Sequence, residues 1–145
     1  MGQEITSIEA AHEWLSRQTS HQLRPGFDRM RHALTILGQP HESLPSIIQL
    51  AGTNGKGSTL AYLQGLFLSQ GLRVGAFSSP HILAFNERLM VDGQPIEDEK
   101  LVALVSTMVE LNEKLIAADW GPLSGFELYT VMMLVYFSQC QLDVC

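Results

Sequence analysis

The chain has 145 residues, the size of a single domain, and its 46% hydrophobic and 17% charged residues are typical of a globular protein. The formal net charge is −6 without a basic stripe, which argues against binding to nucleic acid or to an anionic membrane. Cys140 and Cys145 have neither zinc-ligand spacing nor a disulfide framework, and no signal pattern opens the chain, so we expect free thiols and a cytoplasmic protein.

The first third of the chain predicts two helices. Thr6 or Ser7 can cap the first helix, and its apolar face consists of Ile8, Ala11, Trp14 and Leu15. A Pro-Gly pair predicts a loop at residues 22–26. A second helix is expected from about Phe27 to Leu37, with Gly38 at its C-terminal stop.

The stretch from Ile47 to Thr59 is the most informative part of the sequence. An apolar, β-branched run predicts a strand that begins near Ser46, and a glycine-rich turn and a helical pattern follow it. The turn and the residues after it are Gly52, Thr53, Asn54, Gly55, Lys56, Gly57, Ser58 and Thr59. Glycines let the backbone approach phosphate groups, and the free N–H groups of a helix N-terminus attract anions. Together with one lysine and two hydroxyl groups, which suit phosphate and Mg²⁺, this pattern predicts a loop for a nucleoside triphosphate.

The spacing differs from the common phosphate loop, in which four residues separate the first glycine from the Gly-Lys pair and the hydroxyl residue follows the lysine directly. Here only Thr53 and Asn54 separate Gly52 from the Gly-Lys pair, and Gly57 precedes the first hydroxyl residue. A plain Gly/Asn turn between a strand and a helix remains an alternative. A P-loop phosphotransferase is a second alternative that fits this spacing poorly.

The residues after the loop predict a βαβ unit. A helix follows with an apolar face of Leu60, Leu63, Phe67 and Leu68, Gly71 ends it, and residues 73–77 predict the next strand. Ligands of such sheets bind beyond the C-terminal ends of the strands. We therefore expect residues 52–58 and residues 78–81 to face one site.

The last third predicts a hairpin, two helices and the start of a strand. An Asp-Gly pair places the hairpin at residues 89–96, and three acidic residues open a long helix at 97–99. Its apolar stripe is Leu101, Leu104, Val105, Met108 and Leu115. A nearly all-apolar helix at 126–140 is too short to span a membrane and suits burial in the core. A further core strand begins near Leu142, so the α/β fold is expected to be incomplete at the C-terminus.

Several of these segments, in this order, resemble one family. Residues 52–58, GTNGKGS, resemble the ATP loop of the Mur ligase superfamily. The segment SSPH at 78–81 followed by FNER at 85–88 is similar to folylpolyglutamate synthase, which is often bifunctional with dihydrofolate synthase in bacteria. LRPGFDRM at 23–30 and Phe126-Glu127 also fit, and the resemblance covers essentially the whole chain.

The resemblance implies an α/β fold, a P-loop-containing Mur-ligase-type ATP-binding domain with a parallel sheet flanked by helices. Residues 1–145 would form its N-terminal part, without the C-terminal glutamate-binding domain. It implies an ATP-dependent ligase that joins L-glutamate to a carboxylate of folate or dihydropteroate through an acyl phosphate, with ATP and Mg²⁺ as cofactors. Because a glycine-rich segment with a metal-binding glutamate is absent from these residues, the chain alone is expected to be an inactive fragment. A nucleotide-binding remnant without catalysis remains an alternative.

The resemblance also implies roles for individual residues. Lys56 is the expected catalytic residue and contacts the outer phosphates with the loop amides, and Ser58 and Ser79 are expected to hold Mg²⁺. The loop that shapes the pterin site is expected to include Pro80, His81, Phe85 and Arg88. From the residues alone, Ser79 could be a turn residue and His81 could have no role. Glu87 and Arg88 could form a solvated ion pair, and Glu127 is expected to set the start of a helix and not to act in catalysis.

Overall fold

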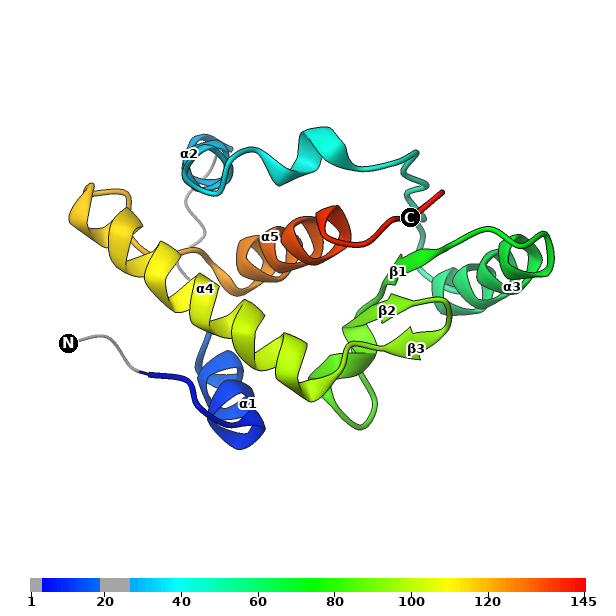
Figure 1. Cartoon of the computed structure of the whole chain (residues 1–145), viewed down its shortest axis with the longest axis horizontal. Helices are drawn as coiled ribbons and strands as arrows, with labels where there is room; N and C mark the ends of the chain where they lie inside the picture. The colour runs from blue at the N-terminus through cyan, green and yellow to red at the C-terminus, as the bar shows by residue number, and fades with distance from the viewer. Residues whose placement is uncertain (1–3, 19–26) are drawn as a thin grey trace.

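The computed structural model describes residues 4–18 and 27–145, and Figure 1 shows helices at one end and a small sheet with one helix at the other. The loop expected at residues 22–26 lies outside the described residues. In chain order the described elements are α1 (Ile8–Arg17), α2 (Asp28–Ile36), the 3-10 helix η1 (Pro40–Ser43), α3 (Lys56–Ser69), β1 (Gly75–Phe77), η2 (Phe85–Arg88), β2 (Leu89–Val91), β3 (Gln94–Pro95), α4 (Asp98–Ala117) and α5 (Gly125–Ser138).

The two N-terminal helices form as their capping residues predict. The Ser7 hydroxyl accepts a hydrogen bond from the Ala10 N–H at 3.2 Å, which satisfies one of the free donors at the start of α1. Three of the four residues on its predicted apolar face, Ala11, Trp14 and Leu15, are buried. Gly38 follows α2 with φ of 78°, a conformation that favours glycine at a helix end.

Helices α4 and α5 form the centre of the core, and α4 also contacts α1 and α2 (Figure 1). The predicted stripe of α4 is confirmed, since all five of its residues are buried. Helix α5 is apolar around most of its circumference, and this suits its position, because α4 covers one side and residues of the sheet region cover another. The expected burial of this helix is confirmed, and no helix of residues 4–18 and 27–145 is both long and apolar enough to cross a membrane.

The regular strands form an antiparallel sheet in the order β1-β2-β3. Gly75 pairs with Val91 at one end of the β1–β2 ladder, and Phe77 pairs with Leu89 at the other. Asp92 and Gly93 join β2 to β3 with φ values of 52° and 79°. Positive φ at both central residues is what a two-residue hairpin turn of type I′ requires, so the predicted Asp-Gly hairpin is confirmed.

Parallel pairing is present next to β1, but only as single bridges. Val144 pairs in parallel with Ser46 on one side and with Val74 on the other. The Ile48 N–H also donates to the Cys145 carbonyl at 2.8 Å, and the Cys145 N–H donates to the Ser46 carbonyl at 3.0 Å. The five segments thus form one mixed sheet with residues 46–48 at its edge.

The strand expected before the glycine-rich turn is therefore shorter than predicted. The structure assigns no strand to residues 47–51, and Ile47 and Ile48 are 58% and 44% exposed. A β-branched run favours an extended backbone, but a strand forms only where a neighbour completes the hydrogen-bond ladder. Beyond the bond between Ile48 and Cys145, no backbone hydrogen bond joins residues 49–51 to another segment among the described residues.

Gly75 is required where β1 passes close to the end of α5. A Cβ atom at this position would lie 2.7 Å from Leu142 Cδ1, 3.1 Å from Phe137 Cε2 and 3.2 Å from Cys145 Cβ. Gly75→Ala should therefore lower the free energy of unfolding by about 1–3 kcal/mol through overpacking. Urea denaturation followed by circular dichroism measures this change.

Gly65→Ala is the matched control, because Gly65 lies inside α3 and an added Cβ would meet nothing within 4 Å. That substitution should raise stability by about 0.5–1 kcal/mol, since alanine is the better helix former. If Gly75→Ala were as stable as the unmodified chain, the close packing between β1 and α5 would not exist in solution.

Candidate functional site

The glycine-rich turn joins the sheet edge to the N-terminus of α3. Gly52 and Gly55 have φ values of 150° and 79°, and Gly55 is the residue directly before the first turn of α3. Both backbone conformations favour glycine, as the sequence predicted, whereas Gly57 lies inside the helix. The turn therefore presents the backbone N–H groups of a helix N-terminus without side chains in front of them, which suits the binding of an anion.

Lys56 adds a positive charge at the same place. It is the first residue of α3, and its Nζ donates a hydrogen bond to the Gly52 carbonyl at 2.6 Å, so the ammonium group lies over the turn. The Thr59 hydroxyl donates to the Gly55 carbonyl at 2.9 Å and stabilises the first helical turn. Every residue from Gly52 to Thr59 is exposed, so a ligand can reach the turn from solvent.

Helix α3 packs loosely on the sheet. Its predicted apolar face is half-buried, and a cavity of about 30 Å³ separates residues such as Leu63 and Phe67 from Val74 and Val144. This cavity is far smaller than the pocket of a nucleotide or pterin. The candidate site is therefore the exposed turn and not this cavity.

The segment after β1 forms a second loop, residues 78–88, and three of the four residues predicted to shape a pterin site come together in it. Arg88 Nε donates to His81 Nδ1 at 2.8 Å, and the Arg88 guanidinium lies 5.6 Å from the centre of the Phe85 ring. The His81 and Phe85 rings are 6.0 Å apart. Pro80 directly precedes His81, and its peptide bond with Ser79 is cis.

Tyr129 of α5 completes this aromatic cluster, and the sequence analysis missed it. Its ring lies 4.9 Å from the Arg88 guanidinium and 5.1 Å from the Phe85 ring, in an edge-to-face arrangement. The helical pattern shows that Tyr129 lies in α5, but it contains no signal for which loop that helix meets. His81 has a defined partner in this loop, so it is not an isolated loop histidine.

Glu87 and Arg88 do not form the solvated ion pair that the sequence left open. The Glu87 carboxylate accepts hydrogen bonds from the backbone N–H groups of Ile82, Leu83 and Ala84 at 2.7, 3.0 and 3.3 Å. The bond from Ile82 is the main cause that lowers the pKa of this carboxyl group, because it stabilises the charged form. Arg88 turns instead toward His81 and the aromatic rings.

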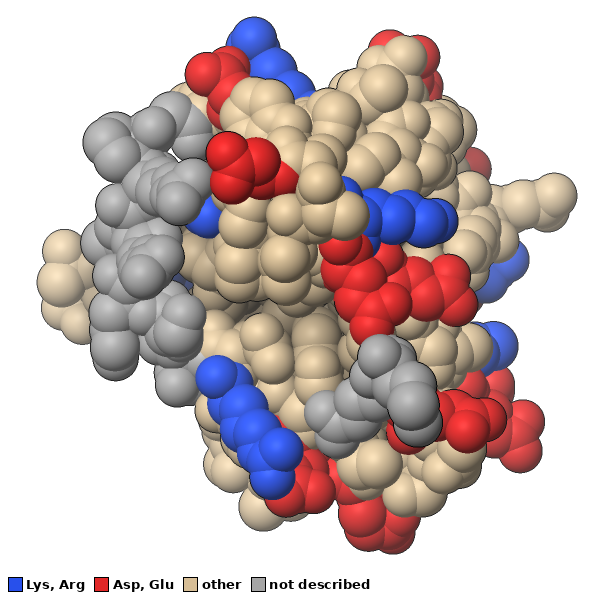
Figure 2. Space-filling model, turned by 90° about the vertical axis from the view of Figure 1, so that its left-hand side faces the viewer, with Lys and Arg blue, Asp and Glu red and all other residues tan. Residues whose placement is uncertain are grey.

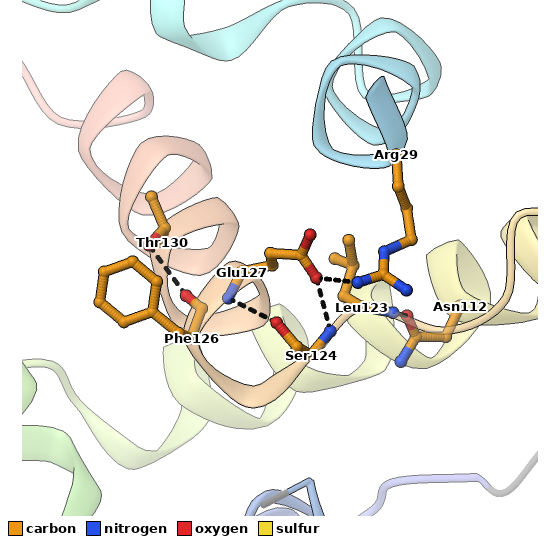
Figure 3. Close-up of polar contacts among 7 residues, drawn as sticks. All are labelled: Arg29, Asn112, Leu123, Ser124, Phe126, Glu127 and Thr130. Carbon is orange, nitrogen blue, oxygen red and sulfur yellow. Dashed lines mark hydrogen bonds and ion pairs between the residues drawn. The ribbon is translucent and has the colours of Figure 1, made fainter. Parts of the chain in front are cut away.

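A third polar group, shown in Figure 3, joins α2 to the start of α5. The Arg29 side chain is only 7% exposed and donates to the carboxylate of Glu127. The same carboxylate accepts from the Ser124 N–H at 2.8 Å, and the Ser124 hydroxyl accepts from the Glu127 N–H at 3.4 Å. This capping box confirms that Glu127 sets the start of the helix.

The Glu127 carboxyl group has a lowered pKa although it is partly buried. Desolvation by burial raises this pKa, but the hydrogen bonds from Ser124 and the charge and hydrogen bond of Arg29 together outweigh it. Arg29 and Glu127 belong to two motifs that lie 98 residues apart, and the sequence contained no sign that they pair.

The surface charge follows the acidic composition. On the face shown in Figure 2, acidic side chains occupy several areas, and lysine and arginine side chains lie between them without gathering into a basic patch. Within residues 4–18 and 27–145, no group of three or more His, Cys, Asp or Glu side chains could hold a metal ion. Ser58 in the first turn of α3 and Ser79 in the loop after β1 are both exposed, and their proposed contact with one metal ion stays a prediction.

Comparison with known proteins identifies the relatives of this chain. No family model matches it. The dihydrofolate synthase/folylpolyglutamate synthase of Bacillus subtilis is 37% identical over 135 residues, which are 93% of this chain and 31% of that protein. A folylpolyglutamate synthetase structure from Lactobacillus casei matches with a TM-score of 0.85 and 33% identity, over 96% of this chain and 35% of the other.

A structure described as an FPGS-AMPPCP-folate complex matches with a TM-score of 0.86 and 30% identity, over 96% of this chain and 34% of the other. The predicted resemblance to these synthases and the Mur-ligase-type α/β fold are thus confirmed. The chain spans about a third of the length of the relatives it matches.

The Arg29–Glu127 pair should make stability depend on pH. Because the pKa of Glu127 is lowered in the folded chain, its ionised form stabilises the fold above about pH 4.3, the ordinary glutamate pKa. This contribution is lost as the pH falls through the lower pKa of the folded state.

Glu127→Gln should reduce the free energy of unfolding at pH 7 by about 2–4 kcal/mol, because Arg29 keeps a buried, unpaired charge. The variant should also lose less stability on acidification than the unmodified chain.

Glu13→Gln is the control for this measurement. Glu13 forms an exposed ion pair with Arg17 within α1, so its loss should change the stability by less than about 0.5 kcal/mol. Urea unfolding at pH 7 and at acidic pH compares the three proteins. Equal stability of Glu127→Gln and Glu13→Gln at pH 7 would show that the buried Arg29–Glu127 pair does not stabilise the fold more than an exposed pair does.

Proposed function

We propose that this chain, which matches about a third of the folylpolyglutamate and dihydrofolate synthases in sequence and fold, is the N-terminal part of the ATP-binding domain of such a ligase. One observation carries the proposal. The glycines before α3 leave the backbone N–H groups at its N-terminus accessible, and the Lys56 ammonium group lies over the same turn. This combination suits the β- and γ-phosphates of ATP.

The charges at the turn complement those of a triphosphate. A triphosphate carries several negative charges, and the partial positive charge of a helix N-terminus together with one ammonium group compensates part of them. The hydrogen bond of Lys56 to the Gly52 carbonyl is a local contact that the amine can exchange for a phosphate oxygen. In the ligase reaction the same groups would stabilise the charge that develops as the γ-phosphate is transferred.

The proposed reaction has two chemical steps. A carboxylate of the folate or dihydropteroate substrate attacks the γ-phosphorus of ATP, which gives an acyl phosphate and ADP. The amino group of L-glutamate then attacks the acyl carbon, so that an amide forms and inorganic phosphate leaves. We propose that the loop of residues 78–88 contributes Pro80, His81, Phe85 and Arg88 to the side of the site that receives the pterin.

Mg²⁺ is the metal ion that we propose for this site. Mg²⁺ in nucleotide sites takes oxygen ligands and keeps several waters, with few ligands from the protein and others from the phosphates. The exposed hydroxyl groups of Ser58 and Ser79 fit such a site, whereas the described residues offer no carboxylate cluster for a cage made by protein alone. Bound with the nucleotide, the ion would neutralise phosphate charge.

The similarity to synthases supports the ligase over a P-loop phosphotransferase, whose usual loop spacing this chain lacks.

We place the protein in the cytoplasm, where ATP is present and thiols stay reduced. Cys140 and Cys145 are free and half-buried, and burial raises the pKa of both thiols and keeps them unreactive.

Lys56→Ala tests the phosphate-binding proposal. The loss of one charge-assisted hydrogen bond costs about 1.5–3 kcal/mol, so the affinity of the chain for Mg²⁺·AMPPCP in calorimetry should fall roughly 10- to 150-fold. Lys114→Ala, which removes a lysine at the far end of α4, should bind like the unmodified chain. In the complete gene product, assayed with ATP, glutamate and each pterin substrate, Lys56→Ala should abolish ligation. Unchanged affinity and turnover would refute the assignment.

Ser79→Ala tests the metal proposal. One hydroxyl group is a modest ligand for Mg²⁺, so the variant of the complete gene product should need more Mg²⁺ for half-maximal activity and should recover part of its rate at high Mg²⁺. Ser69→Ala is the control, because the Ser69 hydroxyl makes only local contacts at the end of α3, where it donates to the Leu66 carbonyl and accepts from Gln70 Nε2. An Mg²⁺ titration that is the same for both variants would make Ser79 a turn residue only.

A further inference from the structure

We propose that Glu87 is a positioning residue that fixes the backbone of residues 82–84, and that Asn86 and Arg88 attach the same loop to the helical core. We call these three consecutive residues, Asn86, Glu87 and Arg88, the loop clamp. The part that the clamp plays in substrate binding rests on the function proposed above. The clamp itself rests only on contacts within the chain.

Glu87 binds the loop from inside. Its Oε2 accepts from the Ile82 N–H, and its Oε1 accepts from the N–H groups of Leu83 and Ala84. Three consecutive backbone donors thus share one carboxylate, and hydrogen bonds to an ionised group are about twice as strong as neutral ones. A side chain that accepts all three N–H groups needs two acceptor oxygens and a negative charge, and only a carboxylate has both.

Asn86 attaches the clamp to two helices and to the residue that follows β3. The side chain is 8% exposed, and its Nδ2 donates to the Ile96 carbonyl at 2.8 Å and to Asp98 Oδ1 at 2.9 Å. Its Oδ1 lies 3.0 Å from His12 Nε2 of α1. The turn that carries Glu87 is therefore held against α1, the residue after β3 and the first turn of α4.

Arg88 closes the loop and joins it to α5. Its carbonyl accepts from the Ser78 N–H at 3.1 Å, so the two ends of the loop are hydrogen-bonded to each other. Its guanidinium group bonds to His81 and lies over the rings of Tyr129 and Phe85. A cation above an aromatic ring is attracted by the electron-rich face of the ring.

The clamp orders residues 82–84, whose two large apolar side chains, Ile82 and Leu83, lie outside the core. Ile82 and Leu83 are each 89% exposed, although the backbone N–H of each is bound to Glu87. Ordering a backbone costs conformational entropy, and two apolar side chains left in water do not offset that cost. Order at such a position is useful if a ligand later contacts the loop, because a preordered loop loses less entropy on binding. We therefore assign the clamp to substrate binding and not to the stability of the fold.

Hydrogen–deuterium exchange on the 145-residue chain tests the clamp directly. In Glu87→Gln the amide keeps one oxygen but loses the charge and presents an NH₂ group to the N–H donors, so exchange at residues 82–84 should become roughly tenfold faster or more. Glu99→Gln, which changes an exposed acid in the first turn of α4, should leave these amides unchanged. Equal exchange in Glu87→Gln and the unmodified chain would overturn the clamp.

Steady-state kinetics of the complete gene product test the positioning role. Glu87→Gln should raise KM for the pterin substrate several-fold, with kcat changed much less, and Glu87→Asp, which keeps the charge on a shorter side chain, should recover part of that loss. Faster loop exchange together with an unchanged KM would overturn the positioning role. If the unmodified gene product has no ligase activity, the proposed function fails, and the exchange measurement still decides whether the clamp exists.

Discussion

The enclosure of α5 is the constraint on which the rest of the structure depends. This helix carries apolar side chains on nearly all sides, so it is stable only if other elements surround it. Helices α2 and α4 and the 3-10 helix η1 pack against it, Tyr129 reaches the Leu15 carbonyl of α1, and Phe137 lies against Gly75 of β1. The first turn of the helix is fixed in direction by the capping box of Ser124 and Glu127 and by the buried charge of Arg29.

The candidate site lies at the border of this core, and its two loops are held in different ways. The glycine-rich turn has only local support, since its bonds run from Lys56 to Gly52 and from Thr59 to Gly55, and α3 contains no buried residue. The loop of residues 78–88 is instead bonded to α1, α4 and α5 through its last residues. Regions with few buried contacts open more easily than the core does. The turn is therefore free to adjust to a ligand, whereas the second loop keeps its shape.

The same difference explains which parts of the site the sequence could predict. The glycine conformations at Gly52 and Gly55, the position of Lys56 and the capping role of Glu127 depend on neighbours within a few residues, and all of them follow from the sequence. The resemblance of the motifs to the synthases also comes from local segments. The solvated pair of Glu87 and Arg88 was a wrong alternative, because the partner of each charge is decided by how the loop folds back on itself.

The sequence by itself determined the helices, the hairpin and the resemblance to the synthases, because helical periodicity, capping residues, the Asp-Gly pair and the glycine-rich turn act over short distances. Only the tertiary structure decided that Arg29 pairs with Glu127, that Tyr129 lies under Arg88, and that Asn86 joins His12 to Asp98. It also decided that residues 47–51 form no regular strand despite their β-branched pattern. The physical reason is the same in each case: a buried charge, a ring or a strand edge is stabilised by a partner distant in sequence, and the amino-acid pattern around one partner contains no information about the other.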